Sequence, residues 1–166
     1  AAERGEITVK EMVDSGHARG VPSFADAAAE RPDVPNWYLE QGVDAVSYSG
    51  GKCLRGPQAS GLVLGRKELL QAAFANGCPH SSIGRPLKVG KEDICALIAA
   101  LERFVSRDEE TEIQEYKRRA DTIVEEIGNI YSVRVQTLIA DPRARPVIPR
   151  VYIDLDPGYM LTGGEI

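Results

Sequence analysis

The stretch that decides the fold runs from Ser47 to Gln58 and reads SYSGGKCLRGPQ. It places Lys52 in a glycine-rich turn, directly after the largely apolar run from Val43 to Val46. A short apolar run that ends in glycines is typical of a buried strand followed by a turn. The sequence therefore predicts a lysine at the carboxyl end of a strand, where ligands bind in open α/β sheets.

A carboxylate follows a second run of the same kind. The segment from Val21 to Ala25 reads as a short strand, and Asp26 comes directly after it. A pyridoxal phosphate site needs these two groups, because a lysine amine forms the Schiff base and a carboxylate keeps the pyridine nitrogen protonated. Ser49 lies three residues before Lys52 and can donate to a phosphate, and the adjacent glycines let the backbone approach closely. The pair of Asp26 and Lys52 thus points to this cofactor.

Each of these residues also has a simpler interpretation. Asp commonly caps helices and turns, and a single lysine is often a solvated surface charge. A phosphate-binding P-loop is the alternative for a Gly-Gly-Lys turn, but its first glycine is replaced by Val46 and its Ser or Thr by Cys53. The combination of Asp26 and Lys52, rather than either residue alone, favours the pyridoxal phosphate hypothesis.

Composition limits the class of protein. The chain has 166 residues, of which 43% are hydrophobic and 27% charged, as in a globular domain. No segment approaches the roughly 20 apolar residues of a membrane span. The net charge of -5 argues against nucleic acid as a partner. The three cysteines form no C-x-x-C pair, which suggests neither a disulfide framework nor a zinc site and fits the cytoplasm. The chain starts at Ala1 and stops soon after a strand-like segment, so we expect a fragment of a longer protein.

The expected elements alternate between helix and strand. Thr8 and Glu11 form a capping box that opens the first helix, which should stop by Gly16 or Gly20. Further helices are expected over Trp37–Gln41, Arg66–Phe74, Lys91–Val105 and, after a break near Asp108, Ile113–Ile127. Strands are expected over Val21–Ala25, Val43–Tyr48, Gly61–Leu64, Val133–Leu138 and Val147–Leu155. This order predicts an α/β layer with parallel strands, two long helices and the start of a smaller α+β unit.

Three segments carry a resemblance to a known family. Residues Pro22–Glu30, Ser47–Leu64 and Ile83–Leu101 resemble the selenocysteine synthase-like family of fold-type I pyridoxal phosphate enzymes. This family is related to bacterial L-seryl-tRNA(Sec) selenium transferase and includes ammonia-lyases that act on phosphorylated sugar acids such as glucosaminate phosphate. Its most specific motif here is SGGK followed by GPQ. The resemblance implies that residues 1–105 are part of the cofactor-binding large domain, its C-terminal half, and that residues 106–166 are a connecting helix and a partial small α+β domain.

The resemblance also implies a role for each site residue. Lys52 would be the Schiff-base lysine, Asp26 the partner of the pyridine nitrogen, Ala28 a contact of the ring face and Ser49 a phosphate ligand.

Arg85 and Lys88 resemble the family's basic pair, which serves the substrate or an incoming anion. A basic turn before the helix that begins near Lys91 explains the same two residues equally well, and the sequence leaves both alternatives open.

The implied reaction begins when Lys52 removes the α-proton of an amino-acid-like small molecule as general base. Elimination or replacement of a β-substituent would follow, as in an ammonia-lyase or a selenium transferase. The alternatives are an aminotransferase-type enzyme, which uses the same Lys and Asp, and a catalytically inactive fragment or paralogue with a structural role. The family resemblance further implies a homo-oligomer whose active site lies between subunits. Composition and residue pattern, by contrast, give no reason to expect a metal, a membrane or nucleic acid as a partner.

Overall fold

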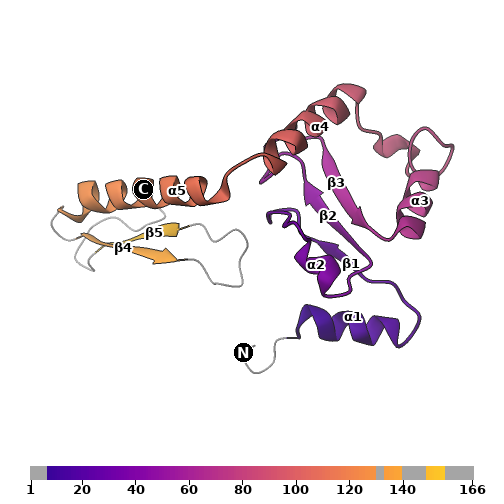
Figure 1. Ribbon diagram of the computed structural model, residues 1–166, viewed down its shortest axis with the longest axis horizontal. Coiled ribbons are helices and arrows are strands. Elements are labelled where there is room, and N and C mark those ends of the chain that lie inside the picture. Colours follow the sequence, from indigo (N-terminus) through magenta and orange to yellow (C-terminus); the bar gives the residue numbers. More distant parts are fainter. Residues whose placement is uncertain (1–6, 130–132, 140–148, 156–166) are drawn as a thin grey trace. The chain divides into compact units, whose positions relative to one another are not determined.

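The computed structural model describes residues 7–129, 133–139 and 149–155 (Figure 1). Its contacts divide the chain into two units, Ala1–Ser106 and Arg107–Ile166. The first unit contains α1 (Val9–His17), β1 (Phe24–Asp26), α2 (Trp37–Glu40), β2 (Ala45–Ser49), β3 (Gly61–Gly65), α3 (Lys67–Asn76), the 3-10 turn η1 (Arg85–Leu87) and α4 (Lys91–Val105). The second contains α5 (Glu109–Gly128), β4 (Val133–Ile139) and β5 (Pro149–Leu155). None of the helices in the described residues is long and apolar enough to cross a membrane.

The first unit is built on a three-stranded sheet in the order β1-β2-β3. β1 and β2 are parallel, as predicted, and pair Phe24 with Ala45 and Asp26 with Ser47. β3 is antiparallel to β2. A parallel return would need a crossover connection of about a dozen or more residues, usually a helix. The connection here is instead a closed turn, in which Gly50 N donates to Ser60 O at 2.9 Å.

The two faces of this sheet are covered to different degrees. Because successive strand residues alternate between faces, Val46 and Tyr48 point toward α4, where Leu97 and Phe104 complete the core. The buried core cluster of this unit is Ala27, Val46, Tyr48, Leu54, Leu97 and Phe104. The opposite face carries Phe24, Asp26, Ala45, Ser47, Ser49 and Val63.

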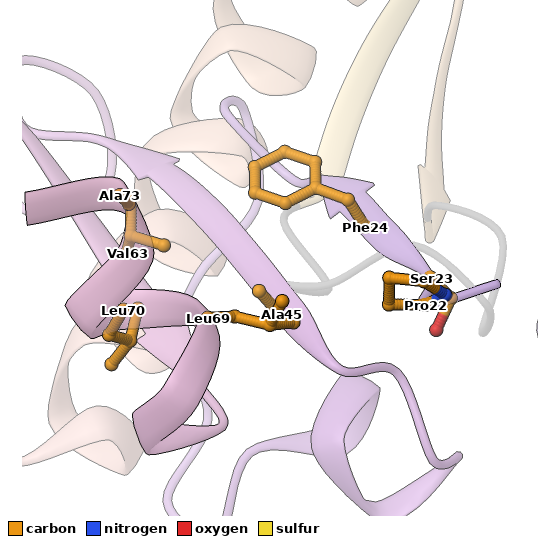
Figure 2. Close-up of a pocket in the computed structure, with 8 residues that line it drawn as sticks. All are labelled: Pro22, Ser23, Phe24, Ala45, Val63, Leu69, Leu70 and Ala73. Carbon is orange, nitrogen blue, oxygen red and sulfur yellow. The ribbon is translucent and has the colours of Figure 1, made fainter. Parts of the chain in front are cut away.

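An apolar cavity of about 240 Å³ lies on this second face, between the sheet and α3 (Figure 2). Its lining is Pro22, Ser23, Phe24, Ala45, Val63, Leu69, Leu70 and Ala73. Phe24 and Val63 remain 63% and 45% exposed, so α3 covers this face only in part.

Several local predictions are confirmed. The capping box is formed, since Thr8 N donates to Glu11 Oε2 at 2.8 Å and Glu11 N donates to Thr8 Oγ1 at 3.2 Å. The break expected near Asp108 is also present: α4 ends at Val105 and α5 begins at Glu109, where Asp108 forms the N-cap by accepting from Glu110 N and Thr111 N. In the second unit, α5 packs against the antiparallel pair of β4 and β5.

The buried stripe of α4 is narrower than its apolar pattern predicts. Leu97 and Phe104 are buried, whereas Ile94 and Ile98 are about half exposed and Val105 is 73% exposed. One three-stranded sheet in the first unit offers too little surface to cover the whole apolar stripe of this helix.

Candidate functional site

The carboxyl ends of β1 and β2 meet at one edge of the sheet, and hydrogen bonds join the turns that follow them. Ala27 N donates to Ser47 O at 2.9 Å, and Ser49 N donates to Ala28 O at 3.4 Å. Cys53 Sγ donates to Ala29 O at 3.4 Å. The first two contacts join the turn after β1 to the last residues of β2, and the third joins it to the turn after β2. The four predicted cofactor residues, Asp26, Ala28, Ser49 and Lys52, lie in these two turns or at the strand ends directly before them.

Asp26 is the last residue of β1 and is exposed. Its Oδ1 accepts a hydrogen bond from Ala28 N at 3.0 Å, which forms an Asx turn. Within the described residues, its Oδ2 has no hydrogen-bond partner. Asp26 therefore acts as the turn residue that its simpler interpretation predicts, and it still presents a carboxylate oxygen at the edge of the sheet.

The turn that carries Lys52 is held by its backbone. Gly56 N donates to Gly50 O at 2.7 Å, and Arg55 N donates to Lys52 O at 2.9 Å. Arg55 adopts a positive φ of 57°, which bends the chain back toward Gly56. The Lys52 side chain is exposed and makes no hydrogen bond or ion pair with any described residue. The turn thus fixes the position of the lysine backbone and leaves its amine available.

The two glycines before Lys52 are required by close packing. A Cβ on Gly50 would lie 2.9 Å from Ser60 O, and a Cβ on Gly51 would lie 2.8 Å from Gln58 Cα. Real Cβ atoms essentially never come so close to backbone atoms, so a larger residue would displace the turn.

We expect Gly51→Ala to lower the free energy of unfolding by about 1–3 kcal/mol, the usual cost of overpacking. Gly128→Ala is the matched control, because a Cβ there meets nothing within 4 Å and alanine favours a helix. Urea unfolding of both variants provides the measurement. A Gly51→Ala protein as stable as wild type would show that the turn does not need this glycine.

Arg85 and Lys88 lie in the connection between α3 and α4, and both are exposed. Arg85 begins η1 and donates to Pro79 O. Lys88 follows directly after η1. In the described part of the chain, no hydrogen bond or ion pair connects either residue with Asp26 or Lys52, so their role in binding a substrate stays a prediction.

One buried residue with several polar contacts, Asp44, was not predicted from the sequence. Asp44 is only 3% exposed and precedes β2, at the edge of the sheet opposite Lys52. Its Oδ2 accepts from Ser23 N at 2.7 Å and from Ser23 Oγ at 3.0 Å, and it lies 2.7 Å from His17 Nε2. Its Oδ1 accepts from Arg66 Nη1 at 3.0 Å. The sequence does contain one signal for it, because Asp44 is a single acid within the apolar run VDAV and a buried charge requires partners.

These contacts lower the pKa of Asp44 well below its ordinary value. The hydrogen bond from Ser23 N–H lowers this pKa most, followed by the bonds with His17 and Arg66. Burial acts in the opposite direction and raises the pKa. A carboxyl whose folded-state pKa is depressed stabilises the fold above its unfolded pKa, about 4, and loses that contribution as pH falls further.

We therefore expect Asp44→Asn to destabilise the protein at pH 7, and the difference from wild type to shrink as pH falls below about 4. Urea unfolding of both proteins between pH 3 and pH 7 measures this difference. Asp14→Asn, which alters an exposed carboxylate paired with Lys10, serves as the control. A difference that stays constant over this range would contradict the assignment.

No group of three or more His, Cys, Asp or Glu side chains in the described ranges is arranged to hold a metal ion. At the Lys52 edge, Lys52, Asp26 and Ser49 carry an amine, a carboxylate and a hydroxyl.

Known proteins are similar to this chain in sequence and in fold. The chain is 33% identical to a 5'-C-glycyluridine monooxygenase-decarboxylase from Streptomyces sp, over 95% of this chain and 37% of that protein. It is 36% identical to D-glucosaminate-6-phosphate ammonia lyase from Salmonella typhimurium, over 61% of this chain and 26% of that protein. The chain thus spans well under half the length of these relatives.

A solved structure of a D-glucosaminate-6-phosphate ammonia-lyase superposes with a TM-score of 0.64 and 27% identity, over 94% of this chain and 39% of that one. This likeness confirms the predicted fold class, part of a fold-type I pyridoxal phosphate enzyme. The family model of L-seryl-tRNA selenium transferase matches residues 2–129. The chain belongs to the L-seryl-tRNA selenium transferase family.

Proposed function

We propose that the whole protein is a pyridoxal phosphate-dependent enzyme that removes the α-proton of an amino-acid-like substrate and then eliminates or replaces a β-substituent. The observation that supports this proposal most directly is the set of hydrogen bonds that joins the turn after β1 to the end of β2 and to the turn after β2. Asp26 and Ser49 are the last residues of their strands, and Lys52 follows Ser49 in the turn.

The residues at this edge fit the cofactor. Among the described residues, Asp26 Oδ2 has no hydrogen-bond partner and can accept from a protonated ring nitrogen, and the Lys52 amine forms no hydrogen bond or ion pair. Ser49 is half-buried at the end of β2, where its hydroxyl can donate to a phosphate. Gly50 and Gly51 have no Cβ beside this hydroxyl, which permits a close approach.

When bound, pyridoxal phosphate supplies the electron sink for the negative charge that forms at the α-carbon. In this proposal Lys52 would hold the cofactor and, as general base, would accept the α-proton of the substrate at Nζ. Asp26 would keep the proton on the ring nitrogen, and Ala28 would pack beside the ring. Arg85 and Lys88 would attract an anionic group of the substrate.

Borohydride reduction followed by peptide mapping tests the proposal. Reduction fixes the cofactor permanently to the lysine that holds it, so the label is expected on the peptide that contains Lys52. The exposed Lys67 on α3 is the internal control and should stay unlabelled. A protein that carries no label would support the inactive or structural alternative, and a label on another lysine would show that Lys52 is not the residue that holds the cofactor.

A second candidate reaction is oxidative decarboxylation of a glycyl-type amino acid. The observation that favours it is the similarity to the monooxygenase-decarboxylase, which covers 95% of this chain, against 61% for the ammonia lyase. Products separate the candidates: β-elimination releases ammonia without oxygen uptake, whereas the alternative consumes oxygen and releases carbon dioxide. Transfer of the amino group to a keto acid would instead indicate an aminotransferase-type reaction.

We also propose that the enzyme works in the cytoplasm as a homo-oligomer with its active site between subunits. Free cysteines at positions 53, 78 and 95 are compatible with a reducing compartment. The partly covered sheet face around Phe24 and the exposed apolar stripe of α4 are surfaces that other parts of the protein could cover. Sedimentation of the whole protein with and without cofactor measures its assembly, and an active monomer would contradict this part of the proposal.

A further inference from the structure

Asp44 and its partners His17, Ser23 and Arg66, here called the Asp44 cluster, lie at the opposite edge of the sheet from Lys52. The cluster is nevertheless hydrogen-bonded to the start of β1, the strand that ends in Asp26. Asp44 and Ser23 are bonded in both directions, since Ser23 N donates to Asp44 Oδ2 at 2.7 Å and Asp44 N donates to Ser23 Oγ at 3.1 Å. Ser23 directly precedes β1, which has only three residues and ends at Asp26. At about 3.3 Å per residue, the cluster is anchored roughly 10 Å from Asp26 along β1.

The same carboxylate also joins two further elements, α1 and β3. His17 is the last residue of α1, and its Nε2 lies 2.7 Å from Asp44 Oδ2. Arg66 follows β3; its side chain donates to Asp44 Oδ1 at 3.0 Å and its N–H donates to Asp44 O at 2.8 Å. The end of α1, the start of β1, the start of β2 and the end of β3 are therefore tied to one buried residue.

The proposed cofactor site requires the register between β1 and β2 that the bonds to Asp44 help to hold. With Phe24 opposite Ala45, Asp26 lies opposite Ser47, and the following turn reaches Ser49. β1 is too short to keep this register strongly by itself, because few ladder bonds fit in three residues. A slip of one residue would move Asp26 to the other face of the sheet.

We propose that Asp44 is a positioning residue, which fixes the register of β1 on β2 from the far edge and so places the Asp26 carboxylate beside the Lys52 turn. Asp44 is too far from this edge to touch the cofactor, and it acts only through β1. The link to the cofactor rests on the function proposed above, whereas the effect on the register of β1 does not.

Amide hydrogen exchange of the whole protein without cofactor tests the anchor directly. The reporters are Ala27 N, bonded to Ser47 O, and Ser49 N, bonded to Ala28 O. We expect Asp44→Asn to accelerate exchange of both by about tenfold, as loss of one bond to a charged group implies. The amides of α4 should change much less.

Two further variants make the result decisive. Ser23→Ala removes both hydrogen bonds of the Ser23 hydroxyl with Asp44, while the bond from the Ser23 backbone N–H stays. A smaller acceleration at the same amides is therefore expected, even if Asp44→Asn is hard to fold. Asp14→Asn changes an exposed carboxylate on α1 and should leave both reporters unchanged. Equal acceleration in α4 and at the reporters, or none at the reporters, would overturn the positioning role.

The loaded protein supplies a second measurement. If Asp44 places Asp26, then Asp44→Asn should shift the pH dependence of the bound-cofactor absorbance in the same direction as Asp26→Asn, by a smaller amount. Faster exchange at the reporters in a protein that never binds cofactor would support the anchor and count against the proposed function. Unchanged exchange at the reporters in an Asp44→Asn protein that binds cofactor on Lys52 would contradict the anchor and support the proposed function.

Discussion

Lys52→Ala is expected to abolish attachment of pyridoxal phosphate and to lower turnover by at least about a thousandfold, because no other group at this edge can form the covalent bond. The fold should survive. The Lys52 side chain is exposed and has no partner among the described residues, so its removal should change the free energy of unfolding by less than about 0.5 kcal/mol. Visible absorbance after incubation with the cofactor and urea unfolding measure the two effects.

Lys52→Arg and Lys67→Ala complete this experiment. The arginine keeps the positive charge but cannot form the bond, so it should behave like alanine if covalent attachment is what matters. Lys67→Ala removes another exposed lysine from the same unit and should leave cofactor binding intact. A Lys52→Ala protein that keeps the long-wavelength absorbance of wild type would mean that another residue holds the cofactor.

Features that depend on local sequence were predictable. The Thr8 and Glu11 capping box and the Asp108 cap lie where the residue types place them, because a cap needs partners only three residues away. The positions of Asp26 and Lys52 at strand ends were predictable for the same reason. Each follows a short apolar run and begins a turn.

Features that depend on tertiary pairing were not predictable. Nothing in the sequence of β3 distinguishes a parallel from an antiparallel strand, and the closed turn from Gly50 to Ser60 decides its direction. β1 was expected to begin at Val21 but begins at Phe24, because Ser23 bonds to Asp44.

The role of Asp44 illustrates the same limit. Its partners His17, Ser23 and Arg66 come from three separate elements, and only the folded chain brings them together. In the sequence Asp44 is a single polar residue within an apolar run, and this pattern shows that partners are needed without identifying them.

The roles of Asp26 can be separated by a pair of substitutions. Asp26→Asn keeps an oxygen that can accept from Ala28 N, so the Asx turn should persist, but it removes the charge that would hold the ring-nitrogen proton. Asp26→Ala removes both the accepting oxygen and the charge. If the charge carries the function, both variants should bind cofactor through Lys52 and lose turnover by about a hundred- to a thousandfold.

The two substitutions should lower turnover to a similar extent but should differ in their effect on stability. Asp26→Ala should lower the unfolding free energy by about 1 kcal/mol through loss of the turn bond, while Asp26→Asn should stay close to wild type. Single-turnover kinetics on the cofactor-loaded protein and urea unfolding measure the two effects side by side. If Asp26→Asn keeps full turnover while Asp26→Ala is merely less stable, then Asp26 is a turn residue alone. The electron sink would then need another acidic partner, and the edge that β1 and β2 form would supply only the lysine.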